Sequence, residues 1–255
     1  MIVSVPARSK PVLRTIGGVA NRLGLRAYAV GGCVRDWLLR RAGHDADLDI
    51  AVEGDALTLA REAARELGGT VTAHEQFGTA TLTLELAAGR RIDFATCRRE
   101  TYARPGAYPK VARGRLRDDL FRRDFTVNAM AVALGGRPER WTLIDPFRGA
   151  RDLRRKELRV LHPRSFLDDP SRLLRGVRFL VRFGLEWEAG TARAAREAAR
   201  AGALGWLNTG RLRKELDRIG AEGRPRESLE CLAELFAPAG PPGRQGPHGR
   251  RIAPA

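Results

Sequence analysis

The sequence is poor in several residue types, and each scarcity narrows the classes of protein to which it can belong. Three of its 255 residues are cysteines, and the spacing of Cys33, Cys97 and Cys231 fits no zinc site. It contains no run of about 18 apolar residues, so we expect no transmembrane helix. The first residues lack the sustained apolar segment of a signal peptide. We therefore expect a cytoplasmic protein with free thiols and no membrane contact.

Lysine is scarce as well, and arginine supplies most of the positive charge. The formal net charge is +16 and the sequence pI is about 11.2, both high for a cytoplasmic protein. Guanidinium groups form paired hydrogen bonds to phosphate, so this charge predicts a polyanionic partner. The alternative is a general arginine and alanine bias of the source proteome.

One stretch near the start combines a strand, a glycine turn and a helix. Residues 27–30 are mostly apolar and end at Gly31 and Gly32, which indicates a strand followed by a turn. Glycines allow the backbone to approach a ligand closely. Residues 34–41 have the apolar spacing of a helix, and Arg35 lies in its first turn. The free N–H groups of that turn and the Arg35 guanidinium predict an anion site suited to a triphosphate.

Two aspartates follow on the next predicted strand. Asp47 and Asp49 are two residues apart, so their side chains project from one face of the strand. Such carboxylates repel each other unless a cation lies between them, and Mg²⁺ prefers carboxylate oxygens together with substrate phosphates. A pair of such ions can activate an attacking hydroxyl and stabilise leaving pyrophosphate. A glycine pair alone is usually a turn and an Asp-x-Asp alone is usually solvated surface, but their combination in this order favours a site.

A third carboxylate, Asp93, lies on a later predicted strand at residues 91–95. It could complete the metal site or act as a base for an attacking RNA hydroxyl. The alternative is an ordinary aspartate at the edge of a strand.

The string RRDFTVNAMA begins at residue 122 and brings three different polar groups together. Arg123, Asp124 and Asn128 present a cation, an acceptor and an amide, which suit phosphate and ribose hydroxyls. The same residues also fit an ordinary helix that Asp124 or Thr126 caps and that continues to residue 134.

Residues 165–184 have the spacing of a helix with an acidic start. Asp168 or Asp169 would cap it, and Pro170 would lie in its first turn. Four arginines then follow along one stripe, namely Arg172, Arg175, Arg178 and Arg182. An aspartate at the head of an arginine stripe can read a base edge while the arginines hold phosphate. A solvated basic face is the alternative.

Several of these strings together resemble one family. GGCVRD, DLDIAV, RRDFTVNAMA and DDPSRLLRGVRF are similar to motifs of the tRNA nucleotidyltransferases and bacterial poly(A) polymerases, the class II branch of the polymerase-β-like superfamily. The match extends over residues 28–216. The chain departs from the pattern at Asp168, where the family commonly has Glu. Family members also usually continue into further helical domains, so this chain resembles a short form.

The resemblance implies roles for the matching residues. Asp47 and Asp49 would be catalytic and would ligate Mg²⁺, with Asp93 as the third catalytic carboxylate. Asp169 and Arg172 would pair with C or A, so that the protein itself acts as the template. The nucleotide-binding residues carried over from the match are Gly31, Gly32, Arg35, Arg123, Asp124, Asn128, Asp169, Arg172, Arg175 and Arg178.

The fold implied is an α+β head, a mixed sheet with flanking helices, followed by an all-helical neck and a truncated body. The long segment 101–117 has the composition of a loop, with two prolines, two glycines and several cations. The predicted domains are a head over residues 1–160, a neck and partial body over 161–236, and a disordered tail over 237–255.

The reaction implied is template-independent addition of C, A or both, from CTP and ATP, to the 3′ end of tRNA, with release of pyrophosphate. A poly(A) polymerase is the alternative within the enzymes, and a catalytically silent RNA-binding module is the alternative outside them. The expected cofactor is Mg²⁺ in a two-metal site, and the expected partners are the tRNA 3′ end and nucleoside triphosphates. A protein partner or an oligomer would compensate for the short C-terminus.

Overall fold

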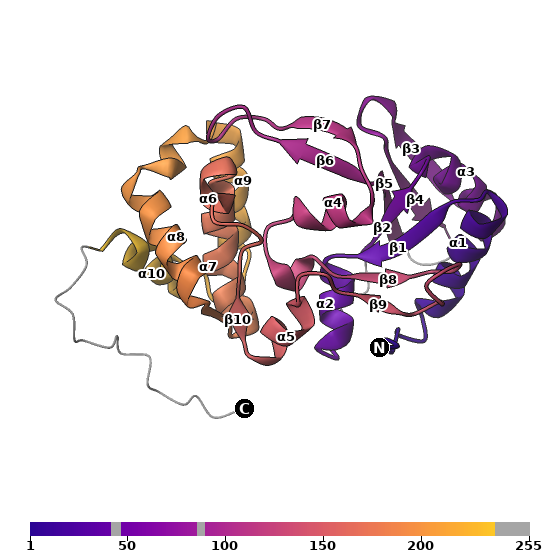
Figure 1. The fold of residues 1–255 in the computed structure, drawn as a ribbon, viewed down its shortest axis with the longest axis horizontal. Coiled ribbons are helices and arrows are strands. Elements are labelled where there is room, and N and C mark those ends of the chain that lie inside the picture. Colours follow the sequence, from indigo (N-terminus) through magenta and orange to yellow (C-terminus); the bar gives the residue numbers. More distant parts are fainter. Residues whose placement is uncertain (42–46, 86–89, 238–255) are drawn as a thin grey trace.

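A mixed sheet with its helices lies beside a bundle of helices in the computed structural model, which describes residues 1–41, 47–85 and 90–237 (Figure 1). Within these residues the large sheet has seven strands in the order β3-β4-β5-β2-β1-β8-β9. The pair β2–β5 is parallel and the other pairs are antiparallel. This confirms the predicted α+β head followed by a helical neck.

The elements have the following bounds. The strands of the large sheet are β1 (Arg26–Val30), β2 (Asp47–Glu53), β3 (Thr70–His74), β4 (Thr79–Leu84), β5 (Arg90–Thr96), β8 (Ala131–Ala133) and β9 (Leu143–Ile144). The helices around it are α1 (Lys10–Arg22), α2 (Gly32–Leu38), α3 (Ala56–Leu67), α4 (Leu116–Phe121) and α5 (Gly149–Arg154). The helices of the bundle are α6 (Ser165–Asp168), α7 (Ser171–Phe183), α8 (Ala189–Arg200), α9 (Thr209–Gly220) and α10 (Pro225–Phe236). A short parallel pair, β10 (Glu157–Leu158) and β11 (Glu186–Trp187), joins the two parts.

The two faces of the sheet differ, and β2 shows the reason. Leu48 and Ile50 are buried in the core that the sheet forms with α1 and α3. Ala51 faces the opposite way, into a smaller core that includes residues of α4. Because side chains alternate along a strand, Asp47 and Asp49 lie on this second face. The packing of the apolar residues against α1 and α3 therefore fixes the side on which the acidic pair is exposed.

The helical neck has its own apolar core, to which the head also contributes. Phe125 and Leu158 are buried together with Phe166 and Leu173 of α6 and α7. The ring of Phe125 lies 5.9 Å from that of Phe179 in an edge-on arrangement. One core thus crosses residue 160, and the boundary placed there stays a prediction.

The segment 101–117 was predicted to be a loop, and this is wrong at both of its ends. Strands β6 (Arg98–Thr101) and β7 (Lys110–Arg113) pair in antiparallel fashion, and α4 begins at Leu116. The strands are short and charged, so they lack the alternation that marks a strand in a sequence. Their structure comes from pairing across the intervening turn, which composition cannot reveal.

The prediction of a helix that Asp124 or Thr126 caps and that continues to residue 134 is also wrong. Thr126–Asn128 form a single 3-10 turn, and the chain then enters β8 between β1 and β9. A strand buried on both faces has no alternation, so its continuous apolar run resembles a buried helix. Asp124 caps no long helix here; its Oδ1 accepts hydrogen bonds from the Phe125 N–H and from the Asn128 amide.

The remaining expectations concern the thiols, the membrane and the tail. Cys33, Cys97 and Cys231 are all free. Among the helices of the described residues, none has the length and apolar character needed to cross a bilayer. The predicted tail lies outside the described residues except for its first residue, Ala237.

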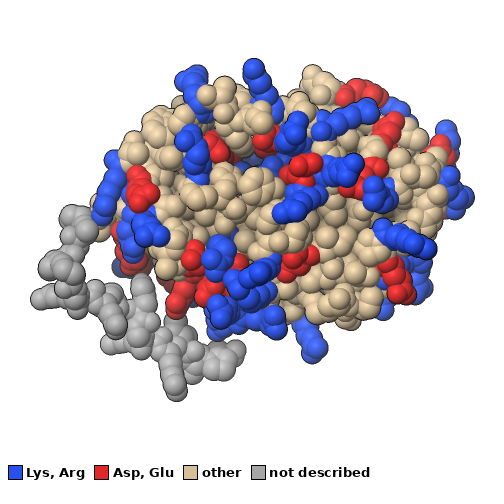
Figure 2. Space-filling view, in the orientation of Figure 1, with Lys and Arg blue, Asp and Glu red and all other residues tan. Residues whose placement is uncertain are grey.

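Figure 2 shows Lys and Arg side chains spread over the visible face, with Asp and Glu between them.

Candidate active site

A cavity of about 500 Å³ lies where the sheet meets the helical neck. Its lining residues come from four stretches of the sequence, namely residues 31–49, 100–128, 169–179 and 211. They are Gly31, Gly32, Arg35, Asp49, Glu100, Tyr102, Tyr108, Pro109, Arg122, Arg123, Asp124, Asn128, Asp169, Arg172, Arg175, Phe179 and Arg211. Nine of the ten residues predicted to bind the nucleotide are in this set, since Arg178 alone among them is missing.

The predicted catalytic carboxylates lie on neighbouring strands at the edge of this cavity. In the parallel ladder Asp49 on β2 stands directly beside Asp93 on β5, so both project from the same face. Asp93 accepts a hydrogen bond of 2.5 Å from the Thr81 hydroxyl. Asp49 lines the cavity, whereas Asp47 and Asp93 are not among its lining residues. The three carboxylates are therefore arranged on one surface, with Asp49 nearest the enclosed space.

The electrostatics of Asp49 fit a site for a cation. Loss of hydration among the surrounding atoms raises the pKa of its carboxyl, and the charges of Asp93 and Asp47 raise it further, while Arg123 acts in the opposite direction. Asp49 still keeps an exposed surface. A divalent ion would relieve this repulsion, and Asp47 and Asp49 are oxygen donors of the kind that Mg²⁺ accepts. In the described part of the chain no three acidic, His or Cys side chains converge into a ready-made metal cage, so substrate phosphates would have to supply further ligands.

Gly31 occupies a position at which a side chain would strain the backbone and displace a neighbouring group. Its φ of +76° is in the left-handed region. A Cβ at this position would lie 2.7 Å from Arg123 Nη1 and 3.6 Å from Asp49 Oδ2. Arg123 in turn donates from Nη2 to Asp119 Oδ2 at 3.0 Å. The turn after β1 thus brings bare backbone, a guanidinium and the acidic strand β2 to one point.

We expect Gly31→Ala to weaken use of the nucleotide without unfolding the protein. The sparsely populated backbone conformation of Gly31, with φ +76° and ψ −131°, costs an alanine about 1–3 kcal/mol, and its Cβ would also displace the Arg123 guanidinium. The efficiency kcat/KM for the nucleoside triphosphate should fall by about tenfold or more. Gly24→Ala is the matched control, because Gly24 also has a positive φ, +68°, but has nothing within 4 Å of its Cβ position. Equal losses in the two variants would contradict this reading of Gly31.

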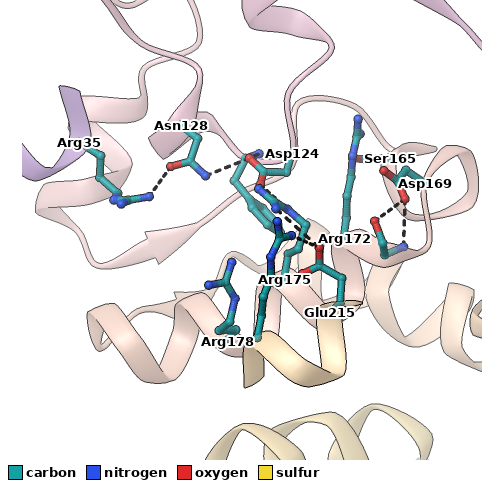
Figure 3. A network of polar contacts seen from close by, with 12 residues as sticks. Arg35, Asp124, Asn128, Ser165, Asp169, Arg172, Arg175, Arg178 and Glu215 are labelled. Atoms are coloured by element: carbon teal, nitrogen blue, oxygen red, sulfur yellow. Dashed lines mark hydrogen bonds and ion pairs between the residues drawn. The ribbon is translucent and has the colours of Figure 1, made fainter. Parts of the chain in front are cut away.

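A polar network of cavity-lining residues connects the head to the neck (Figure 3). Arg35 donates to Asn128 Oδ1 at 2.6 Å, and the Asn128 amide donates to Asp124 Oδ1 at 3.0 Å. Arg175 on α7 donates to Asp124 Oδ2 from Nε at 2.9 Å and from Nη2 at 2.5 Å. Arg35 also stacks over Phe183, 4.1 Å from the ring centroid. Four of the predicted nucleotide-binding residues, Arg35, Asp124, Asn128 and Arg175, therefore also fix the neck against the head.

The Asp124 carboxyl gives the network a pH dependence. Burial alone would raise its pKa, but the charge of Arg175 and the hydrogen bonds from Asn128 and Arg175 outweigh this and lower the pKa from 3.8 to about 2. A carboxyl with a lowered pKa stabilises the fold above its unfolded value and loses that contribution as the pH falls toward the folded value. The shift corresponds to about 2 kcal/mol at neutral pH.

Urea unfolding of wild type and Asp124→Asn tests this between about pH 5 and about pH 2. The difference in the free energy of unfolding between the two proteins should shrink as the pH falls through this window. A difference that stays constant would show that the ionised form of Asp124 is not favoured by folding.

The predicted base-selecting residues lie on the neck side of the cavity. Asp169 Oδ1 accepts from the Ser171 N–H at 3.0 Å and from Arg211 Nη2 at 2.6 Å. Arg172 is buried and donates to the Ser165 hydroxyl at 2.5 Å and to the Arg122 carbonyl at 2.7 Å. These bonds hold both side chains in defined positions at the cavity wall.

Arg178 lies elsewhere, and several cavity residues were not anticipated. Arg178 Nη1 donates to Glu222 Oε1 at 3.1 Å, one turn further along α7 than the cavity residue Arg175. Tyr102 and Tyr108 come from the segment that joins β6 and β7, and Arg211 comes from α9. The segment 101–117 stands out as a whole by its length and composition, but nothing in the sequence distinguishes its tyrosines. Arg211 lies in the string LNTGRLRKEL, which resembles a neck motif of the family. Nothing in that string predicts that Arg211 lines the cavity.

Comparison with known proteins decides the family. Residues 27–159, more than half of the chain, match the poly(A) polymerase head domain. The chain belongs to this family. It is 47% identical over 207 residues to the A-adding tRNA nucleotidyltransferase of Aquifex aeolicus, a match that covers 81% of this chain and 24% of the relative. It is 41% identical over 205 residues to the CC-adding tRNA nucleotidyltransferase of Deinococcus radiodurans, covering 80% of this chain and 52% of the relative.

Solved structures agree with this assignment. The apo form II of a CCA-adding enzyme superposes with a TM-score of 0.84 at 40% identity, over 91% of this chain and 53% of that chain. A tRNA nucleotidyltransferase in complex with a primer tRNA and an incoming ATP analogue superposes with a TM-score of 0.77 at 41% identity, over 86% of this chain and 60% of that chain. The chain therefore has the polymerase-β-like fold, and it spans between 24% and 60% of the length of these four proteins.

Proposed function

We propose that this protein is a template-independent nucleotidyltransferase that adds C, A or both to the 3′ end of tRNA. The observation that carries the proposal is the cavity, because it joins Asp49 and Gly31 of the head to Asp169 and Arg172 of the neck. One wall offers an acidic surface and a phosphate-binding turn, and the other offers groups that can pair with a base edge. Relatives with A-adding and CC-adding names support the reaction class.

The residues divide into three groups in this proposal. Asp47 and Asp49 would hold Mg²⁺, which supplies charge stabilisation for the attacking hydroxyl and the leaving pyrophosphate. Asp93 stands beside Asp49 and is placed to accept the proton of the RNA 3′ hydroxyl. The residues that would contact the nucleotide are Gly31, Gly32, Arg35, Arg123, Asp124, Asn128, Asp169, Arg172 and Arg175.

The balance of the step follows from these positions. The RNA 3′ oxygen attacks the α-phosphorus of CTP or ATP. The bond between the α-phosphorus and the oxygen that bridges to the β-phosphorus breaks, and pyrophosphate leaves with that oxygen. Arg123, beside the Gly31 turn, is placed to bind the triphosphate during this exchange. Asp169 has one carboxylate oxygen engaged by Ser171 and Arg211, so that its geometry is fixed before the nucleotide arrives.

We place residues 1–160 as the catalytic head and 161–236 as the base-selecting neck. The free thiols fit a reducing compartment such as the cytoplasm.

Incubation with tRNA lacking its 3′ CCA, and separately with tRNA ending in CC, tests the function. Each substrate receives one labelled nucleoside triphosphate at a time with Mg²⁺, and the products are sized on a sequencing gel. We expect one or two discrete additions with CTP on tRNA lacking its CCA, or one addition with ATP on tRNA ending in CC, and none with UTP or GTP. A long ladder of A would establish a poly(A) polymerase instead, and no incorporation with intact RNA binding would establish a silent RNA-binding module.

A further inference from the structure

A second hollow, of about 510 Å³, lies between the neck and the residue Arg41 of the head, and it shares no lining residue with the active-site cavity. Its lining consists of Arg41, Arg178, Arg182, Arg218, Ala221 and Glu222, and we call it the arginine hollow. Arg41 follows α2, Arg178 and Arg182 belong to α7, and Arg218 belongs to α9. Two of the four arginines of the predicted α7 stripe, Arg178 and Arg182, therefore line this hollow and not the active-site cavity.

The positive charge of the arginine hollow is only partly compensated. Glu222 Oε1 accepts from Arg178 at 3.1 Å and from Arg182 at 3.2 Å, so two guanidinium groups share one oxygen. Arg218 pairs with Glu215, which also lies 3.9 Å from Arg175. Arg41 donates to the Arg182 carbonyl at 3.2 Å. Within the described residues the hollow thus holds more cations than carboxylates.

The guanidinium groups are held in place before any ligand arrives. Arg41 and Arg182 stack on Phe183, at 4.9 Å and 5.3 Å from the ring centroid. Arg178 is 11% exposed at its side chain, and its Nε is buried without a hydrogen-bond partner in the described structure. Burial lowers the pKa of Arg178, and the charge of Arg175 lowers it further. Positioned arginines of this kind bind anions with little loss of side-chain entropy.

The arginine hollow continues along α9 toward the active-site cavity. Arg218 and Ala221 also line a neighbouring hollow with Arg213 and Lys214, in which Asp217 is the one carboxylate of the lining. At the start of the same helix, Arg211 lines the active-site cavity. Helix α9 therefore carries cations along its length, from the active-site cavity to the arginine hollow.

We propose that the arginine hollow and the adjoining cations of α9 bind the phosphodiester backbone of the RNA whose 3′ end enters the active-site cavity. The inference rests on the proposed function, since it assigns a docking surface to that RNA substrate. Guanidinium groups suit phosphate because they form paired hydrogen bonds. An RNA backbone carries one phosphate at every nucleotide, so it can contact a row of cations such as the one along α9. A single small anion would occupy the hollow but would leave Arg213 and Lys214 without a function.

The double variant Arg182→Gln/Arg218→Gln removes two charges of this surface, and neither residue lines the active-site cavity. We expect the Kd for tRNA lacking its CCA to rise about tenfold at moderate salt. The slope of log Kd against log salt should fall by about 0.7 to 0.9 for each phosphate that the variant no longer binds. The rate at saturating tRNA and the KM for the nucleoside triphosphate should stay unchanged.

Arg61→Gln/Arg65→Gln is the matched control, because it removes two exposed charges from α3, on the far side of the head. Thermal melting of both double variants checks that the fold is retained, and Arg182→Lys/Arg218→Lys should recover part of the affinity because it restores the charge.

The outcomes separate this inference from the proposed function. An unchanged Kd and salt slope in Arg182→Gln/Arg218→Gln, or an equal change in the control, would overturn the docking surface even if wild type incorporates nucleotides. A wild type that incorporates no nucleotide, but whose tRNA binding weakens selectively in that variant, would overturn the proposed function and support the surface.

Discussion

Asp49→Asn is expected to lower the rate of nucleotide incorporation by about 10³-fold or more, because a metal ion contributes several kcal/mol of charge stabilisation in this type of reaction. The amide keeps the size of the side chain but loses the negative charge that a divalent ion requires. Asp49 is the carboxylate that lines the cavity, and it lies beside Asp93 and on the same face as Asp47. Single-turnover incorporation of labelled nucleotide at saturating RNA measures the loss.

Two further measurements keep this result specific. The Kd for RNA should change little in Asp49→Asn, since the carboxylate lies at the reacting end and not on the basic neck. Glu62→Gln on α3 is the matched control, as it neutralises a carboxylate whose partner is the exposed Arg65. A residual rate within about tenfold of wild type would mean that Asp49 does not hold the catalytic metal.

Asp124→Ala should destabilise the fold by about 2–3 kcal/mol, because the partly buried Arg175 guanidinium and the Asn128 amide lose the carboxylate that they share. Asp124 is 7% exposed and binds Arg175 through two hydrogen bonds across the junction of head and neck. The network that includes Asn128 and Arg35 would lose its central acceptor at the same time. Urea denaturation gives the change in the free energy of unfolding.

The double variant Asp124→Ala/Arg175→Met shows whether the unpaired charge is the cause. Removing both charges should recover much of the stability, because a buried ion pair contributes little net energy over an apolar replacement. Nucleotide incorporation should stay low in the double variant, since both residues line the cavity. A double variant as unstable as Asp124→Ala would contradict the unpaired-charge explanation.

The sequence predicted the parts of the site that depend on local spacing. Asp47 and Asp49 share a face because strands alternate, and the apolar residues of that strand identify it in the sequence. Gly31 stands out because glycine permits a turn, and its φ of +76° uses that freedom. In both cases the physical cause lies within a few residues of the position.

The parts that depend on distant contacts could not be predicted in the same way. Arg123 reaches Gly31 only because β8 pairs with β1, and the sequence around β8 resembles a helix. Helical spacing groups Arg178 with Arg172, but Glu222, which follows α9, binds Arg178 instead. Helical periodicity places residues on a stripe but does not identify the neighbour that this stripe faces.

Diffraction from crystals soaked with Mn²⁺ and a non-hydrolysable ATP or CTP analogue tests the central claim most directly, because manganese gives an anomalous signal. The account predicts manganese bound to carboxylate oxygens of both Asp47 and Asp49 and to the triphosphate, with the triphosphate beside Gly31 and Arg123 and the base beside Asp169 and Arg172. Manganese bound away from the two aspartates, or a nucleotide bound outside this cavity, would contradict it.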